Sequence, residues 1–265
     1  MTSVVRPNFA PVKLIQLEKI RVGIVNYLNT KPLLVGLRKL QEAGQIELIE
    51  DYPARIATLL AKKGIDMGLV PVAALPTIPD HSIVGSYCIA TNGEVGSVCL
   101  FSQQPIEQVT RVILDYQSRT SVQLARLLFS QYWKKEVEFI PAVNEMYIDE
   151  IKGSTAGIII GDRALEARSH FPYIYDLGVA WKTFTNLPFV FAVWASVVPL
   201  SKKFITLFDE ANGLGFTQLK EVVAANQQAT KYDLHHYYTT NIDYRITAEK
   251  KEAIRLFLQK LEQIK

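Results

Sequence analysis

Between Ile20 and Leu75, short apolar runs alternate with longer amphipathic segments. The runs Ile20–Val25, Ile46–Glu50 and Ile65–Val70 have the length and β-branched content of buried strands. Between them, the segments Pro32–Leu40 and Pro53–Gly64 begin with proline and carry apolar residues at helical spacing. Because parallel neighbours need a crossover, this order predicts a mostly parallel sheet with helices on both faces.

A second α/β unit follows in the same order. Its expected strands are Arg111–Asp115, Val137–Ile140 and Ala156–Ile160, and its expected helices are Ser118–Trp133 and residues 144–152. Further strands are expected at Ser82–Ile89, Ser97–Ser102 and Phe189–Ala195, and the pattern after Pro199 is helical to the end.

Two such units predict two lobes with a ligand cleft between them. We expect residues 1–97 and 196–265 to form lobe I and residues 98–195 to form lobe II, with chain crossings near Gly96–Ser102 and Phe191–Ser196. If the helical tail packs back on lobe I, the result is the two-lobed clamshell of type II periplasmic-binding-protein-like folds. That architecture is α/β, with mostly parallel sheets and helices on both faces.

Charge and cysteine content narrow the class of partner. The 265 residues include 29 Lys and Arg against 26 Asp and Glu, a net charge of +3, which gives no reason to expect a nucleic acid or a membrane as partner. Cys88 and Cys99 lie in apolar stretches, so we expect buried free thiols in a reducing compartment. Met1–Ile20 lacks a secretory pattern, and no apolar segment is long enough to span a bilayer. We therefore expect a cytoplasmic protein.

Four short loops follow strands of the two units: Asn26–Thr30, Pro71–Ala74, Gln117–Ser121 and Gly161–Arg163. Ligands of open α/β sheets sit beyond the carboxyl ends of the strands, where helix starts present unpaired N–H groups. Two of the loops carry several hydroxyl or amide side chains. Together the loops could line a cleft for a small polar anion.

The polar side chains of these loops each have two interpretations. Thr120 and Ser121 can cap a helix whose first N–H groups face a carboxylate; alternatively they form an ordinary cap beside a solvent-exposed Arg119. Asn26 and Asn29 could hydrogen-bond a substrate hydroxyl or carboxylate, but Asn ahead of a proline-started helix is also a common turn former. The residues alone leave both alternatives open.

The sequence lacks the familiar cofactor and metal motifs. It has no HExxH, CxxC, GxGxxG, Walker A or GxSxG string, so metal, nicotinamide, nucleoside-triphosphate and serine-hydrolase functions lack support. His235 and His236 are adjacent, and neighbouring positions on a helix face different directions, so they do not easily chelate one ion. We expect an anion binder with no cofactor, no metal and no obvious catalytic base.

Seven strings spread over the chain form a consistent set. They are VGIVNYLNTKPL (Val22–Leu33), IDMGLVPVAAL (Ile65–Leu75), GSVCLFSQQPI (Gly96–Ile106), LDYQSRTSVQLARLL (Leu114–Leu128), IIIGDRAL (Ile158–Leu165), YDLGVAWKTFTNLPFVFAVWA (Tyr175–Ala195) and YYTTNIDYRI (Tyr237–Ile246). Together and in order, they resemble the chorismate dehydratase family of the futalosine route to menaquinone. The resemblance covers nearly the whole chain from Ile20 onward.

The resemblance implies a lyase that dehydrates chorismate, a small-molecule substrate, to 3-[(1-carboxyvinyl)oxy]benzoate without a cofactor. Loss of the ring hydroxyl with the neighbouring ring proton yields a benzene ring. The enolpyruvyl carboxylate of the substrate lies close to that proton and could take it. By motif, Asn29 would polarise the substrate beside the reacting centre. The residues expected to contact the substrate, mainly through its carboxylates, are Asn26, Ser97, Ser118, Arg119, Thr120 and Ser121. Ser97 could instead be a hinge residue whose hydroxyl bonds the backbone.

Three other functions share this fold. A non-catalytic binding protein for a small carboxylate would be expected to carry a signal peptide or a cysteine near its terminus. The related 1,4-dihydroxy-6-naphthoate synthase is disfavoured by the SRTSV and GDRAL strings. A LysR-type effector-binding module would need a fused helix-turn-helix, for which the short leader leaves no room.

Overall fold

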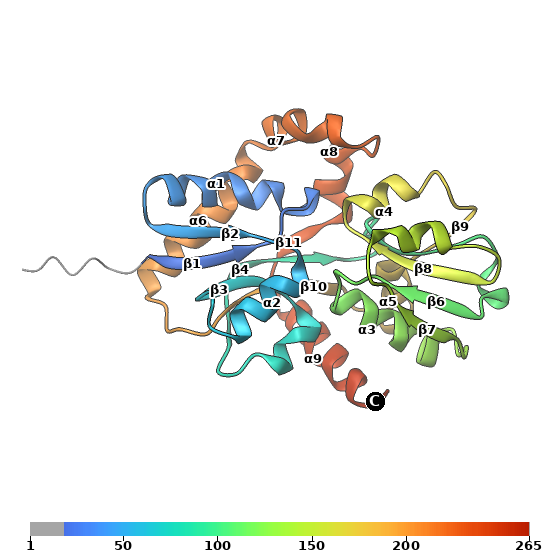
Figure 1. Cartoon of the computed structure of the whole chain (residues 1–265). Coiled ribbons are helices and arrows are strands. Elements are labelled where there is room, and N and C mark those ends of the chain that lie inside the picture. The colour runs from blue at the N-terminus through green and yellow to red at the C-terminus, as the bar shows by residue number, and fades with distance from the viewer. Residues whose placement is uncertain (1–18, 265) are drawn as a thin grey trace, which may run out of the picture.

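The computed structural model describes residues 19–264, which form two β-sheets flanked by helices (Figure 1). The first sheet has six strands in the order β11-β4-β10-β3-β1-β2. Their bounds are β1 Ile20–Ile24, β2 Ile46–Glu50, β3 Met67–Pro71, β4 Ser82–Thr91, β10 Phe189–Ser196 and β11 Asp243–Arg245. Strands β1, β2 and β3 pair in parallel, whereas β10 is antiparallel to both β3 and β4.

The second sheet has five strands in the order β7-β6-β8-β5-β9. Their bounds are β5 Val98–Ser102, β6 Arg111–Leu114, β7 Glu138–Pro141, β8 Thr155–Ile160 and β9 Tyr173–Asp176. Strand β6 pairs in parallel with β7 and β8, and β5 is antiparallel to β8 and β9. In both sheets, the parallel strands are those of the two predicted α/β units. The strands added by the chain crossings make the sheets mixed.

The chain passes between the sheets twice. It leaves the first sheet after β4, enters the second at β5, and returns at β10. Strand β10 thus belongs to the first sheet from Phe189 onward, although the expected lobe boundary assigned residues up to 195 to lobe II. The residues of an apolar strand do not indicate which of two sheets it pairs with, so the sequence pattern could not assign β10 to the first sheet. The division into lobes remains a prediction.

Several helices start at residues suited to that position. Pro32 and Pro53 occupy the first turns of α1 (Lys31–Glu42) and α2 (Pro53–Ala61), where a missing N–H costs nothing. Asp176 accepts from two backbone N–H groups at the start of α5 (Leu177–Thr185), and Ser201 caps α6 (Lys202–Thr217). The other helices are α3 Thr120–Leu127, α4 Asp162–Ala167, α7 Leu219–Asn226, α8 Leu234–His236 and α9 Ala248–Glu262.

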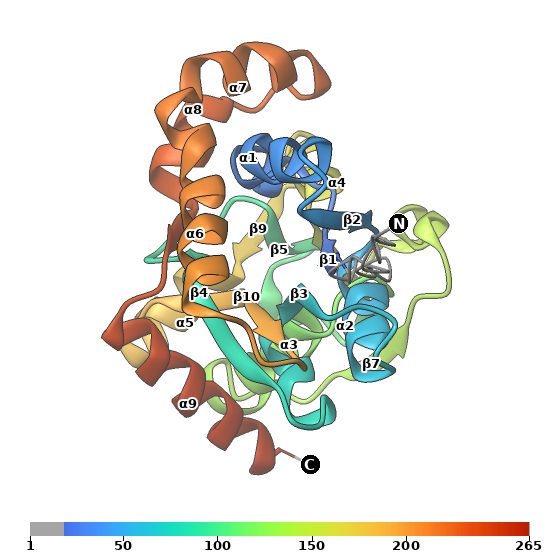
Figure 2. The ribbon, with the colours of Figure 1, turned by 90° about the vertical axis from the view of Figure 1, so that its left-hand side faces the viewer.

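Helix α6 lies against α1 (Figure 2) at a distance that only glycine permits. A Cβ placed on Gly36 would lie 2.0 Å from the carbonyl oxygen of Ala211, and one on Gly215 would lie 2.0 Å from that of Pro32. The two helices therefore meet backbone to backbone. Through this contact, α6 packs on the helix that connects β1 and β2 of the first sheet.

An aromatic cluster joins the last helix to the strand that returns from the second sheet. Trp181 of α5, Phe189 of β10 and Phe257 of α9 contact one another edge to face, with ring centroids 5.0 to 5.9 Å apart. All three are fully buried, and such pairs add stability beyond the area they bury. The cluster fixes β10, which lines the site described below.

Candidate functional site

A pocket with an empty volume of about 560 Å³ lies between the two sheets, at the carboxyl ends of β1, β3 and β8. Its apolar lining comes from Val25, Pro53, Leu69, Pro71, Ile89, Val95, Val98, Ile160, Gly161, Phe191 and Ala192. Its polar lining comes from Tyr27, Asn29, Thr30, Ser97, Ser118, Thr120 and Ser121. Among the described residues, no Asp, Glu, His, Lys or Arg lines it.

Asn29 sits in a tight turn directly after β1. The turn Leu28–Thr30 is a single 3-10 turn, and Thr30 Oγ1 donates to the carbonyl oxygens of Val25 (2.5 Å) and Tyr27 (2.8 Å). The phenol of Tyr244 donates to the Asn29 carbonyl oxygen at 2.9 Å. Within residues 19–264, nothing hydrogen-bonds the Asn29 side-chain amide. The backbone of Asn29 is therefore held, while its side-chain amide has no partner among the described residues.

Ser97 lies on the opposite side of the pocket, just before β5. Its side chain is buried, and its Oγ accepts a hydrogen bond from the Tyr237 phenol at 2.7 Å. Burial raises the pKa of Tyr237 well above its ordinary value, so the phenol stays protonated and acts as the donor. Because Ser97 Oγ accepts from Tyr237, its own proton is available to a ligand.

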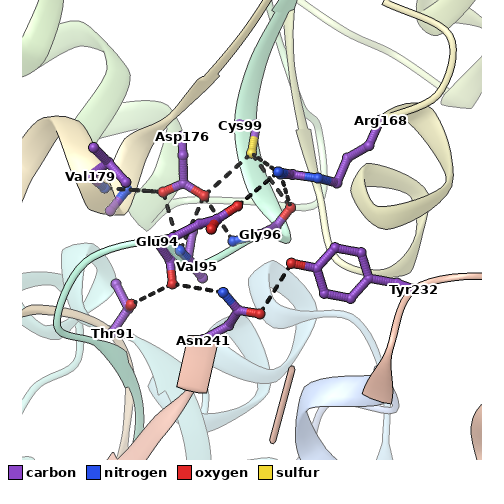
Figure 3. A network of polar contacts seen from close by, with 11 residues as sticks. Thr91, Glu94, Val95, Gly96, Cys99, Arg168, Asp176, Val179, Tyr232 and Asn241 are labelled. Carbon is purple, nitrogen blue, oxygen red and sulfur yellow. Dashed lines mark hydrogen bonds and ion pairs between the residues drawn. The ribbon is translucent and has the colours of Figure 1, made fainter. Parts of the chain in front are cut away.

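The segment before Ser97 is fixed by a polar network from the second unit (Figure 3). The carboxylate of Asp176 accepts from the backbone N–H groups of Val95 and Gly96, at 3.1 and 2.8 Å. Arg168 donates to the Gly96 carbonyl at 3.1 Å and pairs with Glu94 at 2.7 Å. Burial raises the pKa of Asp176, although the backbone N–H bonds oppose that rise.

The C-terminal segment holds the same stretch from the other side (Figure 3). Asn241 donates its amide N–H to the Glu94 carbonyl at 3.2 Å and accepts from the Tyr232 phenol at 3.1 Å. Thr91 Oγ1 donates to the same Glu94 carbonyl at 3.0 Å. Ser97 therefore follows a segment with little freedom to move.

The start of α3 lines a further side of the pocket. The N-cap residue of this helix, Arg119, makes no side-chain capping bond, but Ser118 Oγ accepts from the backbone N–H of Ser121 in the first turn at 3.0 Å. The expectation that Thr120 and Ser121 cap it was wrong. Thr120 Oγ1 instead donates to the Phe191 carbonyl (3.0 Å) and accepts from the Ala73 N–H (3.1 Å), both in the part of the chain that carries the first sheet. The Ser121 hydroxyl has no partner within residues 19–264 and lines the pocket.

Two predicted site residues lie outside the pocket lining. The Arg119 guanidinium donates to Thr58 Oγ1 of α2 at 2.9 Å. Asn26 is exposed, and its side-chain oxygen accepts from Lys31 Nζ at 2.6 Å. The structure thus brings Asn29, Ser97, Ser118, Thr120 and Ser121 together, and it places Arg119 and Asn26 outside the lining.

Tyr27 was not among the predicted site residues. This side chain lines the pocket, and its phenol donates to Gln117 Oε1 across the cleft. Gln117 Oε1 also accepts from Arg163, which pairs with the buried Asp115 carboxylate at 2.7 Å. Burial, followed by the nearby Asp115 charge, raises the pKa of Tyr27, so it is a donor and not a base at neutral pH. The NYLN string marked this position but not its partner, which is 90 positions away.

Cys88 and Cys99 are buried free thiols, as predicted, and burial raises the pKa of Cys88 to about 12. Between residues 19 and 264, no three His, Cys, Asp or Glu side chains gather as a metal would require. In the same range, no helix has the length and apolar content needed to cross a membrane.

Two α/β units joined by two chain crossings, with a pocket between their sheets, define a periplasmic-binding-protein-like fold. Solved structures of that class are similar to this chain. Protein AF1704 from Archaeoglobus fulgidus matches with a TM-score of 0.73 and 12% identity over 94% of this chain and 98% of its own. The periplasmic aliphatic sulphonate binding protein SsuA from Escherichia coli matches with a TM-score of 0.60 and 17% identity over 93% and 91%.

The chain itself belongs to the menaquinone biosynthesis family, whose sequence model matches residues 20–263. A curated relative from Thermus thermophilus, named chorismate dehydratase, is 27% identical over 91% of this chain and 94% of its own length. Family membership and this relative confirm the predicted resemblance and identify the chain as an enzyme.

Proposed function

We propose that this chain is a chorismate dehydratase, which converts chorismate to 3-[(1-carboxyvinyl)oxy]benzoate and water in menaquinone biosynthesis by the futalosine pathway. Family membership and the name of the Thermus relative support this assignment. The observation that carries it is the pocket lining, which in the described part of the chain combines hydroxyls and an amide with no acid, amine or imidazole. We place the reaction in the cytoplasm.

A pocket without a base suits a substrate that carries its own. In the proposed elimination, the enolpyruvyl carboxylate of chorismate takes the ring proton, and the electron pair of the broken C–H bond forms the new ring double bond. The neighbouring hydroxyl departs and, with the proton taken up, leaves as water. The product ring is aromatic, so the step is strongly downhill. Holding the reacting groups in line is worth up to roughly 7 to 11 kcal/mol in favourable intramolecular systems.

The side chains of the pocket then have distinct tasks. The free amide of Asn29 polarises the substrate beside the reacting centre, where developing charge needs an oriented dipole. Ser97 donates its proton to one carboxylate, because its oxygen already accepts from Tyr237. Ser118 and Ser121 receive the other carboxylate at the start of α3, where the first helical N–H groups add positive potential.

Thr120 has a different role, because both hydrogen-bonding capacities of its hydroxyl are used within the protein. It links the second unit to Phe191 and Ala73 of the first and so holds two sides of the pocket together. We assign Arg119 and Asn26 no direct contact with the substrate, since neither lines the pocket. This narrows the set of contacts expected from the sequence.

The test is conversion of chorismate by the purified protein, followed by chromatography and mass spectrometry. We expect an aromatic product lighter than chorismate by the mass of one water, formed without added metal or cofactor. Unchanged chorismate together with saturable chorismate binding would overturn the assignment in favour of a non-catalytic carboxylate-binding protein. Unchanged and unbound chorismate would direct the search to the substrate of the related 1,4-dihydroxy-6-naphthoate synthase.

A further inference from the structure

The turn that carries Asn29 cannot cap itself. Residue Tyr27, which precedes the 3-10 turn Leu28–Thr30, makes no side-chain capping bond, so the first N–H of the turn has no local acceptor. That N–H belongs to Leu28, which is buried, and a buried N–H without a partner is costly. The acceptor is Oδ1 of Asp162, at 2.9 Å and 134 positions further along the chain.

The contact is part of a wider fit between two short segments. Tyr27 and Leu28 belong to the first unit, and Gly161 and Asp162 follow β8 of the second. Gly161 has a φ of +66°, and a Cβ on it would lie 3.1 Å from the ring of Tyr27, so only glycine lets the ring pack there in this conformation. The backbone N–H of Gly161 donates to the Ser97 carbonyl at 2.8 Å.

Two neighbouring residues of the second unit thus touch both candidate site segments. Asp162 holds the Asn29 turn, and Gly161 holds the backbone of Ser97. From the first unit, Tyr244 holds the Asn29 carbonyl oxygen at 2.9 Å. Asn29 is therefore fixed between one anchor from its own sheet and one from across the cleft.

We infer that Asp162 is a positioning residue: it caps the Asn29 turn from across the cleft, so that Asn29 reaches its working orientation only when the two units are together. The inference rests on the proposed function for its kinetic consequence, but the capping contact itself is independent of it. Asp162 does not line the pocket, so it acts through the turn and not on the substrate.

Three variants distinguish this positioning role from a general loss of folding. Asp162→Ala removes the acceptor. Asp162→Asn keeps an acceptor oxygen at the same place and removes the charge. Glu166→Ala is the matched control, because Glu166 is an exposed carboxylate on the same helix α4 whose side chain makes no hydrogen bond within residues 19–264.

The first readout is kinetic, with chorismate as substrate. We expect Asp162→Ala to lower kcat by about 10- to 100-fold, as a small misplacement of a reacting group does, and to change KM by less than about threefold. Asp162→Asn and Glu166→Ala should remain within about threefold of the wild type. Calorimetric titration with 3-[(1-carboxyvinyl)oxy]benzoate should give the same binding stoichiometry for every variant.

Three kinetic results would overturn the inference. They are an unchanged kcat for Asp162→Ala, a loss shared equally by Asp162→Asn, and a loss that matches a reduced binding stoichiometry, which would indicate a misfolded fraction.

The second readout is hydrogen exchange of peptides that cover residues 26–33, which needs no turnover. Exchange at the Leu28 amide should be slow in the wild type and in Asp162→Asn and at least about 10-fold faster in Asp162→Ala. Equal exchange in all three would overturn the capping role even if the kinetics agreed. If the wild type shows protection but no conversion of chorismate, the proposed function fails while the capping role stands.

Discussion

Tyr237 donates its phenol proton to Ser97 Oγ across 2.7 Å, although 140 positions separate the two residues in the chain. Tyr237 lies in the helical turn Tyr237–Asn241 that follows α8, and Ser97 lies in the chain crossing that enters β5. The C-terminal segment thus sets the direction of a hydroxyl in the pocket.

Tyr237→Phe should lower kcat/KM about 3- to 10-fold and the free energy of unfolding by about 1 kcal/mol, because Ser97 loses its donor and can turn away from the substrate. Steady-state kinetics and urea unfolding measure the two effects. Tyr238→Phe is the matched control: the Tyr238 phenol is buried with no partner in the described part of the chain, so its removal should be neutral or stabilising. Equal losses in both variants would contradict the role of Tyr237.

Asn29→Ala should lower kcat by about 100-fold or more while weakening product binding only a few-fold, since the amide is proposed to act on the transition state. Turnover of chorismate and calorimetric binding of the product measure the split. Asn26→Ala, in the same loop but outside the pocket lining, should show the smaller loss. Equal losses in turnover and in binding would reassign Asn29 to plain substrate binding.

Thr120→Val should raise KM about 10-fold, because it leaves the Ala73 N–H and the Phe191 carbonyl without their shared partner and so disfavours the closed pocket. Thr120→Ser keeps the hydroxyl and should retain most of the affinity. Small-angle scattering adds a second check: chorismate should reduce the radius of gyration of the wild type more than that of Thr120→Val. Indistinguishable scattering changes would show that Thr120 has no part in closure.

Acid should destabilise the protein partly through Asp66. Burial alone would raise the pKa of this carboxyl, but hydrogen bonds from Arg21, at 2.7 to 3.1 Å, hold it below its ordinary value of 3.8. A lowered folded-state pKa contributes stability that is fully present above the unfolded-state pKa and is lost as the pH falls below about 4. Urea unfolding should therefore show Asp66→Asn less stable than the wild type at neutral pH, with a difference that shrinks toward about pH 3. A constant difference would rule this contribution out.

Periodicity and proline placement predicted the two α/β units well. Strands β1–β3 and β6–β8 lie within a few residues of their predicted ranges. Each shows in the sequence as a local run rich in apolar residues. The short strands β9 (Tyr173–Asp176) and β11 (Asp243–Arg245) were missed. Both are very short and of mixed polarity. Strand β9 forms by hydrogen bonding to β5, and β11 forms by hydrogen bonding to β4.

The candidate site was predicted as a set of loops but not as a set of contacts. The positions of Asn29 and Ser121 in the pocket lining were predictable because their loops follow strands, whereas Ser97 was predicted only from the family resemblance. No pattern in the sequence predicts that Asp162 and Tyr237 orient them. No local pattern reveals an acceptor that serves a turn 134 positions away.

The lining of the pocket, which has no charged side chain among the described residues, predicts how the KM depends on salt concentration. Sites that grip carboxylates with arginine or lysine lose affinity as ions screen the attraction. In the proposed complex, short contacts to hydroxyl and amide dipoles would bind the carboxylates, and salt screens such contacts less than it screens the attraction between full charges. The KM for chorismate should thus stay nearly level from dilute buffer to several hundred millimolar potassium chloride, and a steep rise would point to an unseen cation at the substrate.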